Sequence, residues 1–385
     1  MIGSSNKTKG CVMQLFMMVA TVVFLASCKG SHGSSSNESD GQELRFAYAE
    51  NISISKHPGY HEVTVRNPWD TVKTLHKYIL VPRDTPLPNN LPQATVVKVP
   101  VGNALVYSTV HAGLIDELGA SDAIGGVCNA QYIRTPIIQQ RIKSGEVADC
   151  GNSMSPDLEK ILKLRPDVIM LSPFENNDRY AKAGDLSIPI IECADYMETS
   201  PLGRAEWIKF YGLLTGKEEL AEKIFSEAES NYLKLKALTT KAQKKPKVVS
   251  DQQYGQIWNV PGGLSTTGIL IEDAGGINPF ASFRKSGSIP LAPEKVLSMA
   301  HDADVWLIKF NQDKDKSLEE LAGDAPVNSQ FKPFKEKTVY GCNTRYARFY
   351  EETPFHPDRI LSDYIKILHP ELMQDVKLNY FHLLK

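Results

Sequence analysis

The sequence of 385 residues lacks the short motifs that mark the common enzyme classes. It has no G-x-S-x-G nucleophile turn, no H-E-x-x-H zinc motif and no G-x-x-x-x-G-K phosphate loop. Glu272 and Asp273 are adjacent acids on a predicted helix. Because neighbours on a helix point in different directions, these two do not form an acid/base pair. These absences favour a binding protein over an enzyme.

The chain also lacks an excess of charge of either sign. Lys and Arg number 43 and Asp and Glu number 45, which gives a formal net charge of −2 at pH 7. The densest basic stretch, residues 241–247, is typical of a solvated helix end and linker. Without a face-sized surplus of cations, we expect no nucleic-acid partner.

Cysteine is scarce, and its spacing forms no motif. None of the six Cys belongs to a C-x-x-C pair or has a nearby His partner, so no metal site, redox motif or bound cofactor is predicted. Cys11 and Cys28 fall in the first segment, and the remaining four are Cys128, Cys150, Cys193 and Cys342. In an exported protein these four either pair in one or two disulfides or stay as buried thiols. The sequence does not choose between the two states.

Residues 1–28 have the pattern of an export signal of a lipoprotein. Lys7 and Lys9 precede an apolar run over residues 12–26, which is too short for a comfortable membrane span. The run ends in Leu-Ala-Ser-Cys28, which resembles the bacterial lipobox, whose Cys is acylated. An ordinary signal peptide with a chance Cys is the alternative. Residues 29–43 predict a flexible tether, so we expect a protein anchored by lipid at the periplasmic face of a bacterial membrane.

The rest of the chain divides into three predicted parts. Residues 44–200 form a first lobe that opens with alternating apolar and polar residues, typical of an antiparallel hairpin. Residues 201–244 place apolar residues three or four apart and predict one long helix, or a pair broken at Thr215 and Gly216. Residues 245–385 form the second lobe.

Both lobes alternate short Val/Ile-rich strands with amphipathic helices. In the first lobe we expect strands at 94–101, 123–129, 167–172 and 188–194, and helices at 104–118 and 155–164. In the second we expect strands at 247–253, 304–309 and 337–343, and helices at 267–274, 292–299 and 356–368. The predicted fold class is α/β, with two Rossmann-like lobes joined by a long rigid helix and preceded by an N-terminal antiparallel strand extension. Such folds bind ligands in a cleft at the carboxyl ends of the strands.

Several segments together resemble the periplasmic binding proteins for iron-siderophores, heme and vitamin B12. They are residues 114–119, 154–161 and 164–169 in the first lobe, and residues 270–278 and 291–297 in the second. The resemblance covers about residues 91–368. It implies a monomer that opens only slightly and hands its ligand to an inner-membrane ABC permease.

Glu159 and Glu294 each lie in the first turn of a predicted helix, one per lobe. The helix dipole favours a carboxylate there whatever the function. The family resemblance implies that both pair with arginines of the permease, where they orient docking more than they supply affinity.

Aromatic and cationic side chains follow the predicted strands, where this family places its ligand contacts. They provide flat apolar area and positive charge, which suit a bulky metal chelate. The expected contacts are Tyr107, Tyr132, Arg134, Tyr254, Trp258, Arg284, Tyr346, Arg348, Phe349 and Tyr350. The alternative for each aromatic residue is packing against its own lobe, and the cluster at 343–350 is the strongest signal.

The sequence thus predicts the substrate-binding component of an ABC importer that captures a ferric siderophore, heme or cobalamin. Tyr132 or Tyr346 suits an axial heme ligand, the arginines favour an anionic ferric chelate, and Trp258 with the tyrosines suits a corrin face. One alternative is a receptor for a free metal ion, which requires several His, Asp or Glu side chains in the cleft. The other is a cofactor-binding enzyme subunit of the chelatase or nitrogenase type, which requires Cys or His ligands there.

Overall fold

The N-terminal strands form a separate sheet ahead of the first lobe. The computed structural model describes residues 41–174 and 187–385, and Cys28 with its predicted signal segment lies outside them. The strands follow the order β1-β2-β3-β4-β5, antiparallel from β1 to β4 and parallel between β4 and β5. They are β1 Gln42–Leu44, β2 Ile52–His57, β3 Tyr60–Arg66, β4 Thr74–Pro82 and β5 Thr95–Val99.

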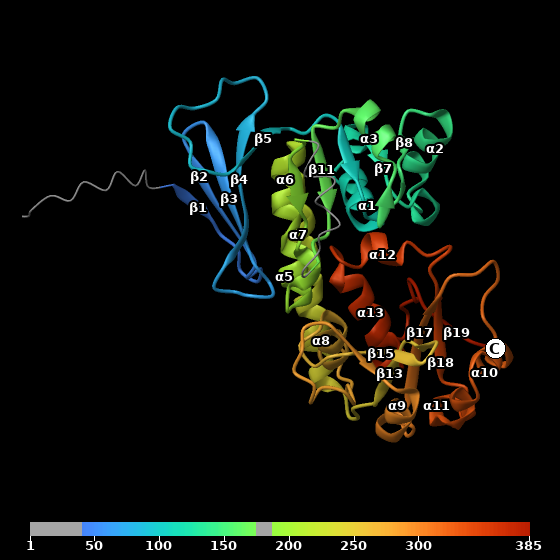
Figure 1. The fold of residues 1–385 in the computed structure, drawn as a ribbon. Coiled ribbons are helices and arrows are strands. Elements are labelled where there is room, and N and C mark those ends of the chain that lie inside the picture. The colour runs from blue at the N-terminus through green and yellow to red at the C-terminus, as the bar shows by residue number, and fades with distance from the viewer. Residues whose placement is uncertain (1–40, 175–186) are drawn as a thin grey trace, which may run out of the picture. The chain divides into compact units, whose positions relative to one another are not determined.

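This sheet is larger than the predicted hairpin because it has a full apolar face to bury. Ile54, Val63 and Val65 are fully buried and share one core with Trp207 and Phe210 of the connecting helices. The strand predicted at 94–101 belongs here as β5 and not to the first lobe. The blue strands of Figure 1 accordingly stand beside the first lobe.

The first lobe is a doubly wound parallel sheet in the order β12-β11-β6-β7-β8. Its strands are β6 Ala104–Val106, β7 Ile124–Val127, β8 Ala148–Asp149, β11 Val168–Leu171 and β12 Ile190–Glu192. The helices that accompany it are α1 Thr109–Glu117, α2 Pro136–Ser144 and α3 Leu158–Leu164. A small ribbon of β9 Gly151–Asn152 and β10 Ser155–Pro156 follows β8.

The order of the strands reverses at β6, the first strand of this sheet in sequence, while all strands stay parallel. The next strand, β7, lies on one side of β6, and β11 lies on the other. The helix expected from residue 104 begins only at Thr109, because residues 104–106 form this buried strand. A switch point of this kind opens a crevice at the carboxyl ends of β6 and β11.

Three helices, and not one, connect the lobes. They are α5 Pro201–Glu206, α6 Ile208–Thr215 and α7 Glu218–Leu238. The break after Thr215 follows the predicted alternative, with Gly216 in the left-handed conformation at φ 67°. The 21 residues of α7 extend over about 30 Å. Its Phe225 packs in the core of the first lobe and its Tyr232 in that of the second, so one helix belongs to both.

The second lobe repeats the layered arrangement with a smaller sheet. Strands β13, β17 and β18 are parallel and β19 closes the edge antiparallel, while β14, β15 and β16 form a second antiparallel sheet. The strands are β13 Val248–Ser250, β14 Gln253–Tyr254, β15 Ile257–Pro261, β16 Ser288–Leu291, β17 Val305–Phe310, β18 Val339–Asn343 and β19 His382–Leu383. The helices are α8 Thr266–Asp273, α9 Pro293–Ala300, α10 Leu318–Asp324, α11 Lys332–Lys335, α12 Phe349–Glu352 and α13 Pro357–Leu368.

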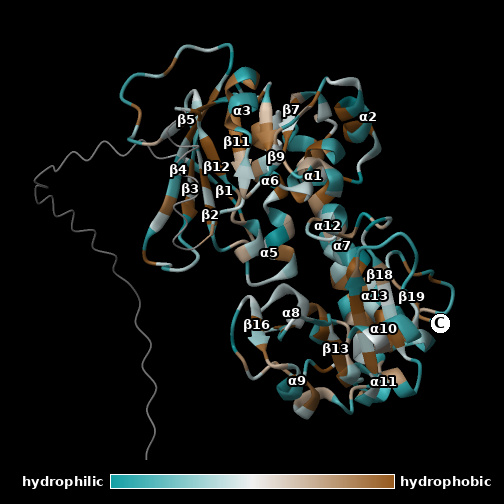
Figure 2. Cartoon of the chain, turned by 45° about the vertical axis from the view of Figure 1, so that its right-hand side comes forward, coloured by the Kyte–Doolittle hydropathy of each residue, from teal (hydrophilic) through white to brown (hydrophobic). Residues whose placement is uncertain are grey.

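Apolar strands form the interior of both lobes. Figure 2 colours β11 and β13 largely brown and much of the outer helix α2 teal, and every residue of β11 and β13 is buried.

Cys128, Cys150, Cys193 and Cys342 are all free and buried, which decides the question left open by the sequence in favour of thiols. Within residues 41–174 and 187–385, no helix has both the length and the apolarity needed to cross a bilayer.

Two buried carboxylates fasten the start of the described chain to the connecting helices. Glu206 accepts the N–H groups of residues 47, 48 and 49 at 2.8, 2.8 and 2.9 Å. Glu198 accepts those of residues 50 and 51 at 3.0 and 2.9 Å, together with Trp207 Nε1–H at 2.8 Å. Five consecutive amides are thereby satisfied by side chains and not by a strand partner.

Candidate functional site

A cavity of about 650 Å³ lies between the two lobes. Its walls are the segments that follow β6, β7 and β11 in the first lobe and β17 and β18 in the second. Parallel strands bring these segments to the same edge of each sheet, and the switch point at β6 and β11 leaves room between them. The cavity therefore lies where a two-lobed α/β fold is expected to bind a ligand.

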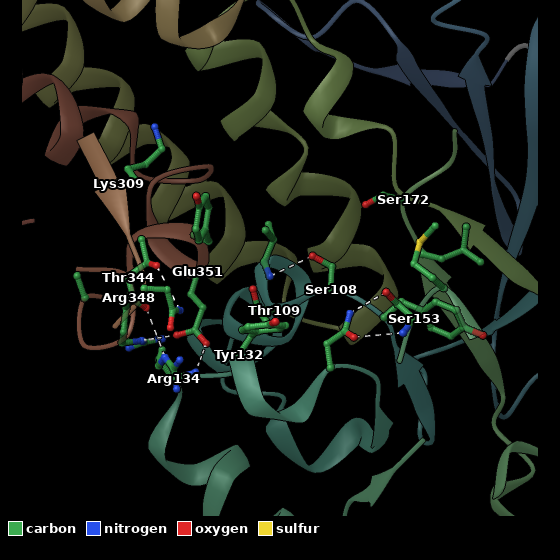
Figure 3. A pocket seen from close by; sticks show the side chains of 18 of the residues that line it. Ser108, Thr109, Tyr132, Arg134, Ser153, Ser172, Lys309, Thr344, Arg348 and Glu351 are labelled. Carbon is green, nitrogen blue, oxygen red and sulfur yellow. Dashed lines mark hydrogen bonds and ion pairs between the residues drawn. The ribbon is translucent and has the colours of Figure 1, made fainter. Parts of the chain in front are cut away.

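The wall contributed by the first lobe is rich in uncharged polar groups. Ser108 begins α1, and its Oγ accepts the N–H of Val110 at 3.2 Å. Asn129 adopts a left-handed conformation with φ 53°, and its side-chain amide donates to Ser153 Oγ at 2.7 Å. In Figure 3, Ser153 and Ser172 lie on the opposite side of the cavity from the charged residues.

Three charged side chains meet where the lobes touch. Glu351 is 3% exposed, and its Oε1 accepts the backbone N–H groups of Arg134 at 2.6 Å and Thr135 at 3.2 Å. Its Oε2 accepts Arg348 Nε–H at 2.8 Å. Burial alone lowers the pKa of Arg348, but Glu351 and then Glu352 outweigh it and the pKa rises. Figure 3 shows Arg134, Arg348 and Glu351 gathered at one end of the cavity.

Lys309 faces the cavity from the end of β17. Its ammonium forms an ion pair with Asp251 and lies 5.8 Å from the ring centre of Phe349. Burial opposes the charged form, but Asp251 outweighs burial and raises the pKa of Lys309 above its ordinary value. Tyr350 lies close by, and burial raises the pKa of its hydroxyl.

Five of the predicted ligand contacts line the cavity. Tyr107 is 6% exposed, whereas Tyr132 and Tyr350 are 53% and 48% exposed. Arg134 and Arg348 come from opposite lobes. That these side chains bind a ligand stays a prediction.

The other five predicted contacts do not line the cavity, and Trp258 needs a correction. Trp258 is fully buried, stacks on Trp306 and donates its Nε1–H to the Ser250 carbonyl, so it belongs to the core. Tyr254 is 90% exposed on the β14–β15 turn and Arg284 is exposed on a loop. Tyr346 is 64% exposed and donates its hydroxyl to the carbonyl of residue 313. Phe349 packs against Tyr380 and Phe381 and supports Lys309 from behind.

Several cavity residues were not predicted. Lys309 is the only charged residue within the otherwise apolar strand β17, and this position is the signal that was available. Glu351 directly follows the aromatic cluster that was predicted to bind ligand. Met154 and Phe174 are about half exposed at the cavity, and nothing in their sequence context separates them from ordinary loop residues.

The residues predicted to dock a permease lie as expected on helix starts. Glu159 is exposed in the first turn of α3, and Glu294 is exposed in the first turn of α9. Their pairing with a permease stays a prediction. Among residues 41–174 and 187–385, no group of three or more His, Cys, Asp or Glu side chains is arranged to hold a metal ion.

Comparison with known proteins identifies the family. An uncharacterized lipoprotein of Methanocaldococcus jannaschii is 27% identical over 323 residues, which cover 80% of this chain and 76% of that protein. An ABC-type Fe3+-hydroxamate transport protein of Saccharomonospora viridis superposes with a TM-score of 0.56 at 13% identity, covering 70% of this chain and 94% of its own.

A molybdate-binding periplasmic protein of a Haemophilus influenzae ABC transporter gives a TM-score of 0.58 at 18% identity, covering 72% of this chain and 89% of its own. At these identities the two solved structures show a shared fold of two lobes. The family described as periplasmic binding protein matches residues 105–346, more than half of the sequence. The chain therefore belongs to the periplasmic binding protein family.

Proposed function

We propose that the chain is the substrate-binding component of an ABC importer that captures a ferric siderophore or a related metal chelate, such as cobalamin or heme. The cavity of about 650 Å³ between the lobes carries this proposal. Its volume lies within the usual range for pockets that enclose a small organic ligand, and a single ion needs far less space. Tyr132 and Tyr350 offer flat apolar area and Arg134 offers positive charge, a combination that suits a metal chelate.

The family relationship bears on the alternatives. As a member of this family, the chain is a binding protein and not an enzyme, so the alternative of a cofactor-binding enzyme subunit is wrong. The Saccharomonospora viridis structure belongs to a Fe3+-hydroxamate system, which supports a chelate. The molybdate-binding relative shows that the same fold also accepts an oxyanion. The ligand must therefore be inferred from the side chains of the cavity.

Attachment and delivery complete the proposal. Acylation of Cys28 would tether the protein to a membrane, in keeping with the lipoprotein of Methanocaldococcus jannaschii. Glu159 and Glu294, one exposed carboxylate per lobe, would meet cationic residues of the permease and orient the loaded protein.

The test is calorimetric titration of the protein lacking residues 1–28. The probes are cyanocobalamin, hemin, a ferric trihydroxamate, a ferric tris-catecholate, molybdate and zinc. Tryptophan fluorescence is a poor reporter here because Trp207, Trp258 and Trp306 are fully buried. We expect submicromolar binding of one chelate, and we expect Tyr132→Ala to weaken it by about tenfold, or about 1.4 kcal/mol.

Tyr254→Ala is the matched control, because Tyr254 is even more exposed than Tyr132 but does not line the cavity. Its affinity should equal that of the unmodified chain. Binding of zinc or molybdate alone, or equal losses in the two tyrosine variants, would contradict the proposal.

A further inference from the structure

Most of the positive charge in the cavity is already neutralised by the chain itself. Among the residues that the structure describes, three cationic side chains line the cavity: Arg134, Lys309 and Arg348. Lys309 is paired with Asp251, and Arg348 is paired with Glu351 through Nε and Oε2 at 2.8 Å. A cation that is held by a carboxylate in a low-dielectric site offers little further attraction to an anionic ligand.

Arg134 is the exception. Its Nε donates to the carbonyl of Thr344 at 3.4 Å, and within residues 41–174 and 187–385 its guanidinium joins no ion pair. The carboxylate of Glu351 reaches only the backbone N–H of Arg134 and is already shared with Arg348. Lys309 thus has Asp251 as its partner, and Arg348 has Glu351 and Glu352, whereas Arg134 has no carboxylate partner among the described residues.

The opposite wall of the cavity offers hydrogen bonds without charge. Ser108, Asn129 and Ser153 present hydroxyl and amide groups, and no acidic or basic side chain lines that wall among the described residues. Neutral polar groups match carbonyl, amide and hydroxamate oxygens of a ligand. They do not compensate the desolvation of several negative charges.

From this arrangement we infer that the ligand is a chelate of nearly neutral net charge, carrying at most a single negative charge that lies against Arg134. A neutral ferric trihydroxamate or a corrinoid fits this description, and a triply negative ferric tris-catecholate does not. The inference rests on the proposed function and narrows its ligand class. A trianion would have to separate Lys309 from Asp251 or Arg348 from Glu351 before those cations became available.

The test compares probes of similar bulk and different charge by calorimetry. The neutral ferric trihydroxamate or cyanocobalamin should bind at least about tenfold more tightly than the ferric tris-catecholate, a difference of about 1.4 kcal/mol. Arg134→Gln should weaken the preferred neutral chelate by less than about tenfold, because a neutral ligand draws little on the charge. The affinity of the unmodified protein for the neutral chelate should also change little between low and high salt, because salt screens only interactions between charged partners.

Removing a counter-charge should reduce or abolish the preference for the neutral chelate. Asp251→Asn frees Lys309, and Asn tolerates the backbone of residue 251, where φ is 61°. The variant should bind the tris-catecholate about tenfold more tightly than the unmodified protein does. The matched control is Asp313→Asn, which removes an 81% exposed carboxylate paired with Arg345 outside the cavity. Its preference should stay unchanged.

The outcomes separate the two proposals. If the tris-catecholate binds more tightly than every neutral probe, the inferred charge class is overturned while the receptor function stands. The same holds if Asp251→Asn folds but leaves the preference unchanged. If no chelate of any charge binds, the proposed function fails and the inference fails with it.

Discussion

The first lobe buries carboxylates in two different ways, at two places only a few residues apart in the chain. At the N-terminal junction, Glu198 and Glu206 are satisfied mainly by the backbone amides of residues 47–51. Behind the cavity, Asp195 is 1% exposed and is satisfied by side chains. It accepts from Tyr211 at 3.0 Å and pairs with His111 at 2.9 Å and Arg204 at 3.1 Å.

The difference shows what each arrangement stabilises. Amide donors belong to the backbone, so Glu198 and Glu206 fix the path of one segment against the connecting helices. The partners of Asp195 lie on α1, α5 and α6, so this carboxylate joins three helices. Because α1 begins at the cavity with Ser108, the position of the cavity wall depends on the second arrangement.

The largest expected effect is at Asp195. Asp195→Asn removes the negative charge and leaves the buried imidazolium of His111 and the guanidinium of Arg204 uncompensated. Removal of one partner of a buried ion pair lowers the free energy of unfolding by roughly 3–5 kcal/mol. Urea denaturation at pH 7 measures this loss. Glu371→Gln is the control, because Glu371 is a 60% exposed partner of His369 and its loss should stay within about 0.5 kcal/mol. Equal losses of stability in Asp195→Asn and Glu371→Gln would contradict the proposed role of the buried carboxylate.

A smaller loss is expected at the N-terminal junction. Glu206→Ala leaves three amides and Lys209 without their carboxylate, but no charge is stranded in the interior because Lys209 still reaches Glu222. We expect a loss of about 3 kcal/mol. Hydrogen exchange should accelerate at residues 47–49 and stay unchanged at residues 134 and 135, whose amides donate to Glu351. Faster exchange at both places would mean that the two arrangements are one cooperative unit.

Sequence patterns predicted the layers of the fold better than the residues of the site. Period-two alternation identified β2 and β3, and strand–helix alternation identified both lobes, because these patterns reflect local burial. The order of strands depends on distant pairings, which is why β5 was assigned to the wrong sheet. Dependence on distant contacts also explains the break between α5 and α6 at Trp207. Its side chain is fully buried and donates its Nε1–H to Glu198.

Within the site, Trp258 was predicted as a ligand contact but is buried in the core, whereas Tyr132 lines the cavity. Both are aromatic residues that follow a predicted strand. In β15 the burial alternates, with Trp258 and Val260 inward and Ile257 outward, but the apolar Ile257 on the outer face hides this alternation in the sequence. The pairing of Lys309 with Asp251 was not visible in the sequence either, because it joins the ends of two separate strands. Counting arginines therefore predicted a more cationic cavity than the chain provides.

A third expected effect is a dependence of stability on pH that differs between the two arrangements. Burial opposes the charged form of His111, but Cys193 and Asp195 outweigh it and raise the pKa from 6.5 to about 10. A raised histidine pKa contributes stability that is complete below pH 6.5 and is lost as the pH rises through about 10. Burial raises the pKa of Asp195, but His111 and Arg204 outweigh it and the pKa is lowered, so its contribution is lost in acid as the pH falls from 3.8 through the lowered value.

Glu198 should respond in the opposite sense to Asp195. Burial raises its pKa above 4.5 despite the amides that it accepts, so its protonated form is favoured in the fold and its contribution declines as the pH rises through the raised value. Urea midpoints measured from pH 4 to 10 should show a loss of stability on the alkaline side. That loss should be absent in His111→Asn, and Glu198→Gln should change only the acid side. If the loss of stability at high pH persists in His111→Asn, another group causes it. The carboxylates Asp195 and Glu198 would then not be distinguished by their response to pH.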